Sequence, residues 1–191
     1  MTRRSPQEDL LAVALERHGF VTAQDARALD IDPVRLRQMA RRGVVVRVSR
    51  GVYRFAMVPA TRFDDYAAAS LWPVGVQGVL SHETALDLHE LCDVNPAYID
   101  VTVPRSHRVR SRTVPPRYRM HQRDLAPGEV THFERMPIVT PVRAVLDGVE
   151  TGLRTDLVRQ AIDTLRRRRE LAGRDEERIF AALYARRDAT G

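Results

Sequence analysis

The chain has 191 residues, of which 43% are hydrophobic, so it can form one domain or two small ones and is too apolar for a disordered protein. Its formal net charge is +6, and all 31 basic residues are arginine, which excludes a Walker loop or any other site that requires lysine. No apolar run reaches the roughly 18 residues of a membrane span, and the single cysteine excludes an intramolecular disulfide and a cysteine zinc cluster.

Three helix-start signals follow one another in the N-terminal part of the chain. Residues 5–8, Ser-Pro-Gln-Glu, form a capping box before a helix that we expect to end at Gly19. Residues 22–25 form a second box, which opens a short helix. Asp32 and Pro33 have the residue types of an N-cap and of a first helical position, and they predict a third helix that runs to Gly43.

A β-hairpin is predicted directly after the third helix. The β-rich runs at residues 44–48 and 52–55 flank the tripeptide Ser-Arg-Gly, which is typical of a hairpin turn. Three short helices followed by a hairpin have the element order of a winged helix-turn-helix. We therefore expect residues 1–60 to form a DNA-binding domain of this type.

The third predicted helix has one apolar side and one basic side. At about 100° per residue, Leu36, Met39 and Ala40 form a single apolar stripe. The opposite side carries the candidate DNA contacts Val34, Arg35, Arg37, Gln38, Arg41 and Arg42. Arginine reads guanine, glutamine reads adenine, and a small apolar side chain can meet a thymine methyl group, so this mixture suits a recognition helix. The alternative interpretation is a solvated arginine face with Val34 packed against an earlier residue.

Arginines also mark the predicted hairpin, with Arg47 on the first strand, Arg50 at the tip and Arg54 on the return strand. Strand alternation places Arg47 and Val45 on one face, opposite Val44, Val46 and Val48. Arginines of a wing contact backbone phosphate or enter the minor groove, and we expect these three to do so. The alternative is that they are solvated charges that discourage aggregation at a sheet edge.

Residues 61–191 are predicted to form a second domain, with a mixed α/β architecture and a helical tail, so that the whole chain is α+β. The boundary is placed at Pro59-Ala60-Thr61. Apolar periodicity predicts helices near residues 64–72, 82–91 and 142–149, strands near residues 98–103, 118–122, 130–133 and 138–139, and two final amphipathic helices near residues 154–169 and 175–187.

A basic segment lies in the middle of this second domain. Residues 63–104 contain seven acids and no arginine, whereas residues 105–123 contain seven arginines and no acid. Within the latter, a Pro- and Arg-rich loop carries Arg105, Arg108, Arg110 and Arg112. A solvated loop and a second contact with DNA or with an acidic partner both fit this composition.

Catalytic and metal chemistry finds little support in the residue pattern. His82-Glu83 resembles the start of a zinc-protease helix, but leucine occupies position 86 and His89 lies about 10 Å further along a helix. We expect His82 and His89 to be structural histidines and Cys92 to be a small buried apolar residue. The sequence has no clustered carboxylates and no glycine-rich loop, so no catalytic residue, metal or cofactor is predicted.

In its order of motifs, the chain resembles the AbiEi-type antitoxins, transcriptional regulators of bacterial abortive-infection toxin–antitoxin pairs. The resemblance covers about residues 10–170 and is carried by the segments Ile31–Tyr53, Leu80–Leu91, Val101–Pro104 and Ile138–Asp147. It implies a protein that represses its own operon by binding inverted repeats in the promoter, and that neutralises a nucleotidyltransferase-like toxin. We expect a monomer or weak dimer and no membrane partner.

Two other classes of function are left open by the residues. One is a winged-helix transcription regulator whose C-terminal domain senses a small ligand and which has no toxin partner. The other is a nucleic-acid-processing enzyme, which the absence of lysine and of an acidic cluster disfavours. The N-terminus lacks the apolar stretch of a signal peptide, and we expect a cytoplasmic protein.

Overall fold

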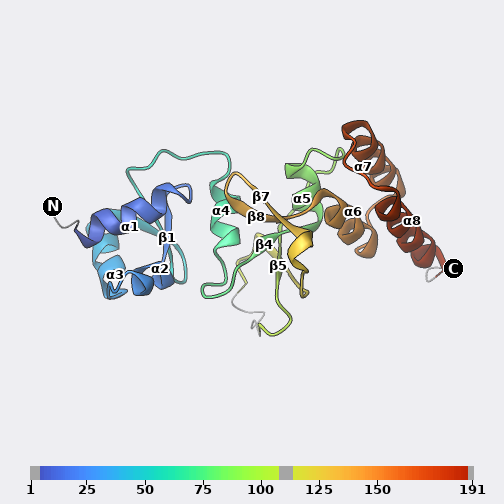
Figure 1. Cartoon of the computed structure of the whole chain (residues 1–191). Helices are drawn as coiled ribbons and strands as arrows, with labels where there is room; N and C mark the ends of the chain where they lie inside the picture. Colours follow the sequence, from blue (N-terminus) through green and yellow to red (C-terminus); the bar gives the residue numbers. More distant parts are fainter. Residues whose placement is uncertain (1–4, 108–113, 189–191) are drawn as a thin grey trace. The chain divides into compact units, whose positions relative to one another are not determined.

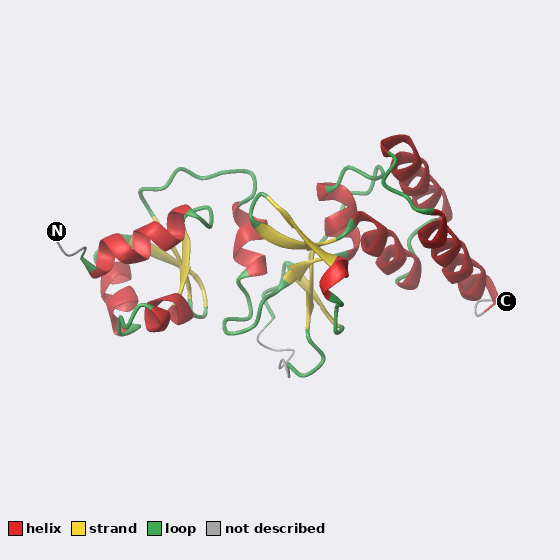
Figure 2. Cartoon of the chain, in the orientation of Figure 1, coloured by secondary structure: helices red, strands yellow, loops and turns green. Residues whose placement is uncertain are grey.

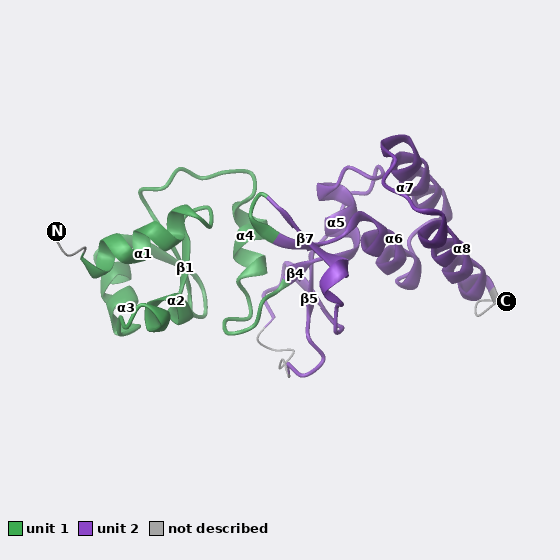
Figure 3. Ribbon diagram, viewed as in Figure 1, with its two compact units in different colours: residues 1–78, 134–136 green, residues 79–133, 137–191 purple. Residues whose placement is uncertain are grey.

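The computed structural model describes residues 5–107 and 114–188. The chain divides into two compact units, one formed by residues 1–78 with 134–136 and one by residues 79–133 with 137–191 (Figure 3). The boundary predicted near residue 60 falls inside the first unit. Among the described residues, no helix is both long and apolar enough to cross a membrane.

The first unit begins with the predicted winged helix-turn-helix (Figures 1 and 2). Its helices are α1 (Pro6–Leu15), α2 (Ala23–Ala28) and α3 (Val34–Arg41), followed after the wing by α4 (Asp64–Ser70). The strands are β1 (Phe20–Thr22), β2 (Val45–Ser49) and β3 (Val52–Phe55), which form an antiparallel sheet in the order β1-β3-β2. The sheet therefore has one strand more than the predicted hairpin, because Phe20–Thr22 pairs with β3.

Local capping sets the ends of the first two helices. The Ser5 amide donates to Glu8 Oε2 at 2.6 Å, and the Glu8 amide donates back to Ser5 Oγ at 3.3 Å. Thr22 and Asp25 repeat the exchange at 2.8 and 3.1 Å. Both predicted capping boxes are therefore confirmed. Between these helices and the sheet lies a core of Leu10, Ala14, Val21, Ala26, Ile31, Leu36, Met39, Val45, Tyr53 and Phe55.

The second unit is built on a five-stranded mixed sheet in the order β6-β5-β4-β8-β7. Its strands are β4 (Val79–Leu80), β5 (Ile99–Val103), β6 (Tyr118–Gln122), β7 (Val130–Phe133) and β8 (Met136–Val139). Its helices are α5 (His82–Leu88), the short 3-10 turn η2 (Pro127–Glu129), α6 (Pro141–Glu150), α7 (Thr155–Arg168) and α8 (Gly173–Asp188). The chain is thus α+β, with the predicted helical tail formed by α7 and α8 (Figure 2).

Candidate functional site

Helix α3 presents the predicted basic side to solvent. Leu36 and Met39 are buried, and Val34 is exposed together with Arg35, Arg37, Gln38, Arg41 and Arg42. The orientation expected from a spacing of about 100° per residue is confirmed. Val34 is 36% exposed and does not belong to the core. Whether these side chains bind DNA stays a prediction.

The N-terminus of α3 is held by the residue that was expected to cap it. The helix begins at Val34, one residue later than predicted, and Pro33 occupies the cap position with φ −55° and ψ −16°. Asp32 Oδ1 nevertheless accepts a hydrogen bond from the Val34 amide at 2.8 Å. The first turn, which would enter the major groove, is therefore fixed by a carboxylate two residues upstream.

In the wing, only one valine of the first strand points into the core. Val45 is buried, whereas Val46 and Val48 are 57% and 46% exposed. The register between β2 and β3 shifts between Arg47 and Ser49, which marks a β-bulge. Arg47 and Arg50 are exposed, so the wing offers two arginines and two apolar side chains to a partner.

Arg54 differs from the other candidate contacts because its guanidinium is already occupied. Its side chain is only 16% exposed, and its Nε lies 2.8 Å from Asp64 Oδ2. Its Nη2 donates to the Pro59 carbonyl at 2.8 Å, and its guanidinium lies 5.7 Å from the centre of the Phe20 ring. This geometry leaves little of Arg54 for a phosphate group.

Only part of the predicted basic loop lies within the described residues. Arg105 follows β5 and is exposed, and its amide donates to Asp124 Oδ1 at 3.0 Å. Arg108, Arg110 and Arg112 lie outside the described residues. A second basic contact in this loop therefore stays a prediction.

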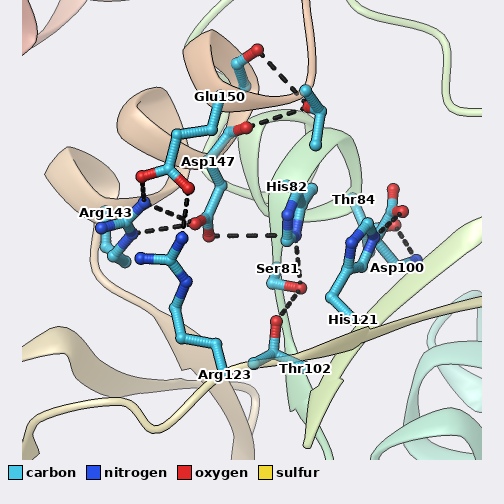
Figure 4. A network of polar contacts seen from close by, with 12 residues as sticks. Ser81, His82, Thr84, Asp100, Thr102, His121, Arg123, Arg143, Asp147 and Glu150 are labelled. Atoms are coloured by element: carbon cyan, nitrogen blue, oxygen red, sulfur yellow. Dashed lines mark hydrogen bonds and ion pairs between the residues drawn. The ribbon is translucent and has the colours of Figure 1, made fainter. Parts of the chain in front are cut away.

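A network of buried polar side chains in the second unit was not anticipated from the sequence (Figure 4). Seven buried residues of α5, α6, β5 and the end of β4 take part: Ser81, His82, Thr84, Asp100, Thr102, Arg143 and Asp147. The chain thus places several ionisable groups inside its own core, which is costly unless each is paired.

A pair of histidines joins the part of the network on α5 to the part on β5 and β6. The His82 and His121 rings are stacked, with their centres 3.5 Å apart. His121 Nε2 lies 2.8 Å from Asp100 Oδ1, and His82 Nδ1 lies 2.9 Å from Ser81 Oγ. His82 has φ +52°, a left-handed conformation that is uncommon outside glycine. The surrounding contacts therefore hold His82 in a strained backbone conformation.

On helix α6, Arg143 contacts two acidic residues of the same helix. Its Nε and Nη2 lie 2.9 and 2.7 Å from Asp147 Oδ1, and Nη2 lies 2.7 Å from Glu150 Oε1. Arg123, which follows β6, pairs with the other oxygen of Glu150. Asp147 Oδ2 is buried and accepts no hydrogen bond from any described residue, and His82 Nδ1 lies 3.9 Å from it.

These groups do not form a hydrolase triad, although Ser81, His82 and an aspartate lie together. The same ring nitrogen, His82 Nδ1, faces both Ser81 and Asp147, so the imidazole cannot relay a proton between them. Ser81 is fully buried and cannot reach a substrate. Among the described residues, no three side chains of His, Cys, Asp or Glu are arranged to hold a metal ion.

The other residues discussed as chemical candidates have structural surroundings. His89 Nε2 donates to the Val139 carbonyl at 2.9 Å, and burial lowers the pKa of His89. Burial raises the pKa of the Cys92 thiol to about 11, so thiolate is scarce at neutral pH. Asp64 and Asp65 lie in the first turn of α4, as their spacing predicts.

The buried histidine makes the stability of the chain depend on pH. Burial lowers the pKa of His82 from 6.5 to about 3, and the nearby charges of His121 and Arg143 add to the shift. Below pH 6.5 the unfolded chain therefore binds a proton at His82, whereas this ring stays neutral in the folded chain until the pH approaches 3. Stability from this residue is complete above pH 6.5 and falls, by up to about 1.4 kcal/mol per pH unit, as the pH drops toward 3.

Urea unfolding of the wild type and of His82→Asn between pH 7.5 and 4.5 measures this effect. Asparagine tolerates the left-handed backbone but does not titrate. The free energy of unfolding should fall less steeply with acid in the variant. His89, whose lowered pKa acts in the same direction, and Asp147, whose raised pKa opposes it, are common to both proteins. Equal slopes in the two proteins would mean that His82 does not stay neutral in the folded chain.

Two comparisons with known proteins find a similarity, one to a family model and one to a solved structure. Residues 8–56 match the family model described as "Transcriptional regulator, AbiEi antitoxin". The solved structure of the Rv2827c protein from Mycobacterium tuberculosis is similar with a TM-score of 0.56 and 15% identity, over 97% of this chain and 76% of that chain. At this identity the likeness concerns the fold alone. No curated protein matches the chain significantly.

Proposed function

We propose, from the match of residues 8–56 to the AbiEi antitoxin regulators, that the chain is a sequence-specific DNA-binding antitoxin that represses its own operon. The observation that carries this proposal is the exposed side of α3, where arginines and a glutamine stand opposite a buried apolar stripe. In the major groove, Arg37, Gln38 and Arg41 would read base edges, and Val34 would meet a thymine methyl group. Arg35 and Arg42, at the sides of the helix, would contact phosphate.

The exposed wing completes this surface. Arg47 and Arg50 would bind the phosphate backbone or the adjacent minor groove, as arginines of wings do. One α3 helix reads one half-site, so an operator with inverted repeats would bind two copies of the chain.

Fluorescence anisotropy with the duplex upstream of the chain's own gene tests the proposal. The full chain should bind this duplex far more tightly than a scrambled duplex of equal length and composition at physiological salt, since specific sites typically exceed non-specific ones by about 10³ or more. Equal affinity for both duplexes would rule out a sequence-specific repressor.

We further propose that the second unit neutralises a nucleotidyltransferase-like toxin, as the family resemblance implies. Its support is that this unit has its own sheet and core. A ligand-sensing regulator remains the competing function. A toxin gene directly beside this one favours the antitoxin, and its absence favours the ligand sensor.

The two proposed activities should separate in the full chain. The variant with both Arg37→Ala and Arg41→Ala changes only exposed side chains of α3, so the second unit should stay folded. Co-expressed with the neighbouring toxin from an unrelated promoter, it should protect cells as well as the wild type while failing to repress a reporter. Loss of protection at equal protein level would mean that neutralisation requires DNA binding.

A further inference from the structure

We propose that Arg54 is a positioning residue of the wing, which acts through Asp64, and that residues 57–78, here called the supporting segment, hold the wing in its DNA-binding position. This inference rests on the proposed DNA-binding function. It assigns a role to a part of the first unit that lies outside the matched residues 8–56.

The first contact joins strand β3 to the supporting segment. Arg54 pairs with Asp64 at 2.8 Å and donates to the Pro59 carbonyl at 2.8 Å. Asp64 is itself fixed, because its Oδ1 accepts from the amide and the hydroxyl of Thr61 at 3.0 and 2.9 Å. One guanidinium thus ties the return strand of the wing to the supporting segment, through an ion pair with Asp64 and a hydrogen bond to Pro59. Both charges of the ion pair are mostly buried, and Arg54 Nε has no hydrogen-bond partner among the described residues.

The second contact lies at the tip of the wing. Gly51 has φ +80°, and a Cβ atom at this position would lie 3.2 Å from Cγ2 of Val74. The Gly51 carbonyl accepts from the Ala23 amide at 2.8 Å, at the start of α2. The turn that carries Arg50 is therefore packed against the supporting segment on one side and bonded to the helix-turn-helix on the other.

A third contact anchors the other end of the same sheet. Gly19, with φ +87°, precedes β1, and a Cβ atom there would lie 2.9 Å from Cβ of Val58. The Gly19 carbonyl accepts from the Phe55 amide at 2.8 Å. The three contacts lie along the sheet that contains the wing, so loosening the supporting segment would let the wing move away from a fixed α3. A prepositioned wing binds DNA without the entropy cost of ordering it.

The decisive variant is Asp64→Asn in the full chain, measured by anisotropy with the upstream duplex. If charge alone governed affinity, removing an acid from a DNA-binding unit would tighten binding. A positioning role predicts the opposite, a weakening of about tenfold. The matched control is Asp30→Asn, which removes the same charge at an exposed residue with φ +56°, a conformation that asparagine accepts. The control should bind as tightly as the wild type or more tightly.

The salt dependence separates positioning from direct contact. Arg50→Ala should reduce the slope of log affinity against log salt by about 0.9, the value for one lost phosphate contact. Arg54→Met should weaken binding and leave this slope unchanged. Hydrogen exchange should be faster for the amides of residues 47–52 in Asp64→Asn and unchanged for those of α3, which a general loss of stability would not produce.

The positioning role is overturned if Asp64→Asn binds as tightly as the wild type, or if Arg54→Met reduces the salt slope as Arg50→Ala does. Binding is compared at a temperature at which urea titrations show each variant to be folded. If the wild type itself does not distinguish the upstream duplex from the scrambled one, the proposed function fails. The exchange measurement then still decides whether Asp64 positions the wing.

Discussion

Replacing Arg37 by alanine is expected to weaken binding to the native promoter by about 1–3 kcal/mol, or roughly 5- to 150-fold, as the loss of a bidentate contact with guanine does. Arg37 is exposed on α3, and no ion pair or side-chain hydrogen bond is found for it in the described part of the chain. Its guanidinium is therefore available for a base. Arg41, one turn further along the same face, should behave in the same way.

The loss at Arg37 should be selective for sequence. Anisotropy titrations compare the wild type with Arg37→Ala on the promoter duplex and on a scrambled duplex. The substitution should reduce the affinity for the promoter duplex much more than the affinity for the scrambled duplex. Arg159→Ala, which removes an exposed arginine from α7, is the control for charge. Equal losses on both duplexes would reassign Arg37 to the phosphate backbone. No loss on either would mean that another face of α3 enters the groove.

The features that the sequence predicted well are those decided by neighbouring residues. Ser5 with Glu8 and Thr22 with Asp25 act within one turn, so a capping box read from residue types is found in the structure. The burial of Leu36 and Met39 follows from helical period alone. In the wing, alternation separated Val45 correctly from Val46 and Val48, which are exposed. It was wrong for Val44, which was expected on the other face but packs against the same core as Val45.

Contacts between distant segments could not be predicted in this way. Asp100 and His121 meet only because β5 and β6 are paired in parallel, a register that no local pattern reveals. The sequence predicts Arg54 at the DNA because it shows that Arg54 lies on the return strand. It does not show that Arg54 pairs with Asp64. Arg168 likewise donates to the carbonyls that end α5, at 2.7 Å for His89.

One signal of the buried network was present in the sequence. Arg143, Asp147 and Glu150 have the spacing of a single helix face, on which an arginine and an aspartate four residues apart attract each other. Such pairs are ordinarily found on exposed faces, whereas here the face that carries them is buried. The burial follows from how α6 packs, with Val145, Ala144 and Leu146 also inside, so nearly the whole helix circumference is covered.

The burial of this pair leads to the largest expected effect on stability. Arg143→Met should lower the free energy of unfolding by about 3–5 kcal/mol, because it removes the guanidinium that is paired with the buried Asp147 carboxylate. Burial already raises the pKa of Asp147, and Arg143 opposes that rise. Without the guanidinium, the pKa of this carboxyl rises further. The loss should therefore be greatest near neutral pH and shrink as acid neutralises Asp147, opposite in sign to the effect of His82.

A second substitution shows whether the unpaired charge is the cause. Asp147→Leu, combined with Arg143→Met, removes both charges and fills the site with apolar atoms, so this double variant should be more stable than Arg143→Met alone. Glu150 keeps Arg123 as its partner in both proteins. Urea unfolding at pH 7.5 and 5.5 measures the three proteins. A double variant no more stable than the single one would mean that the guanidinium packing of Arg143, and not its charge, supports the core of the second unit.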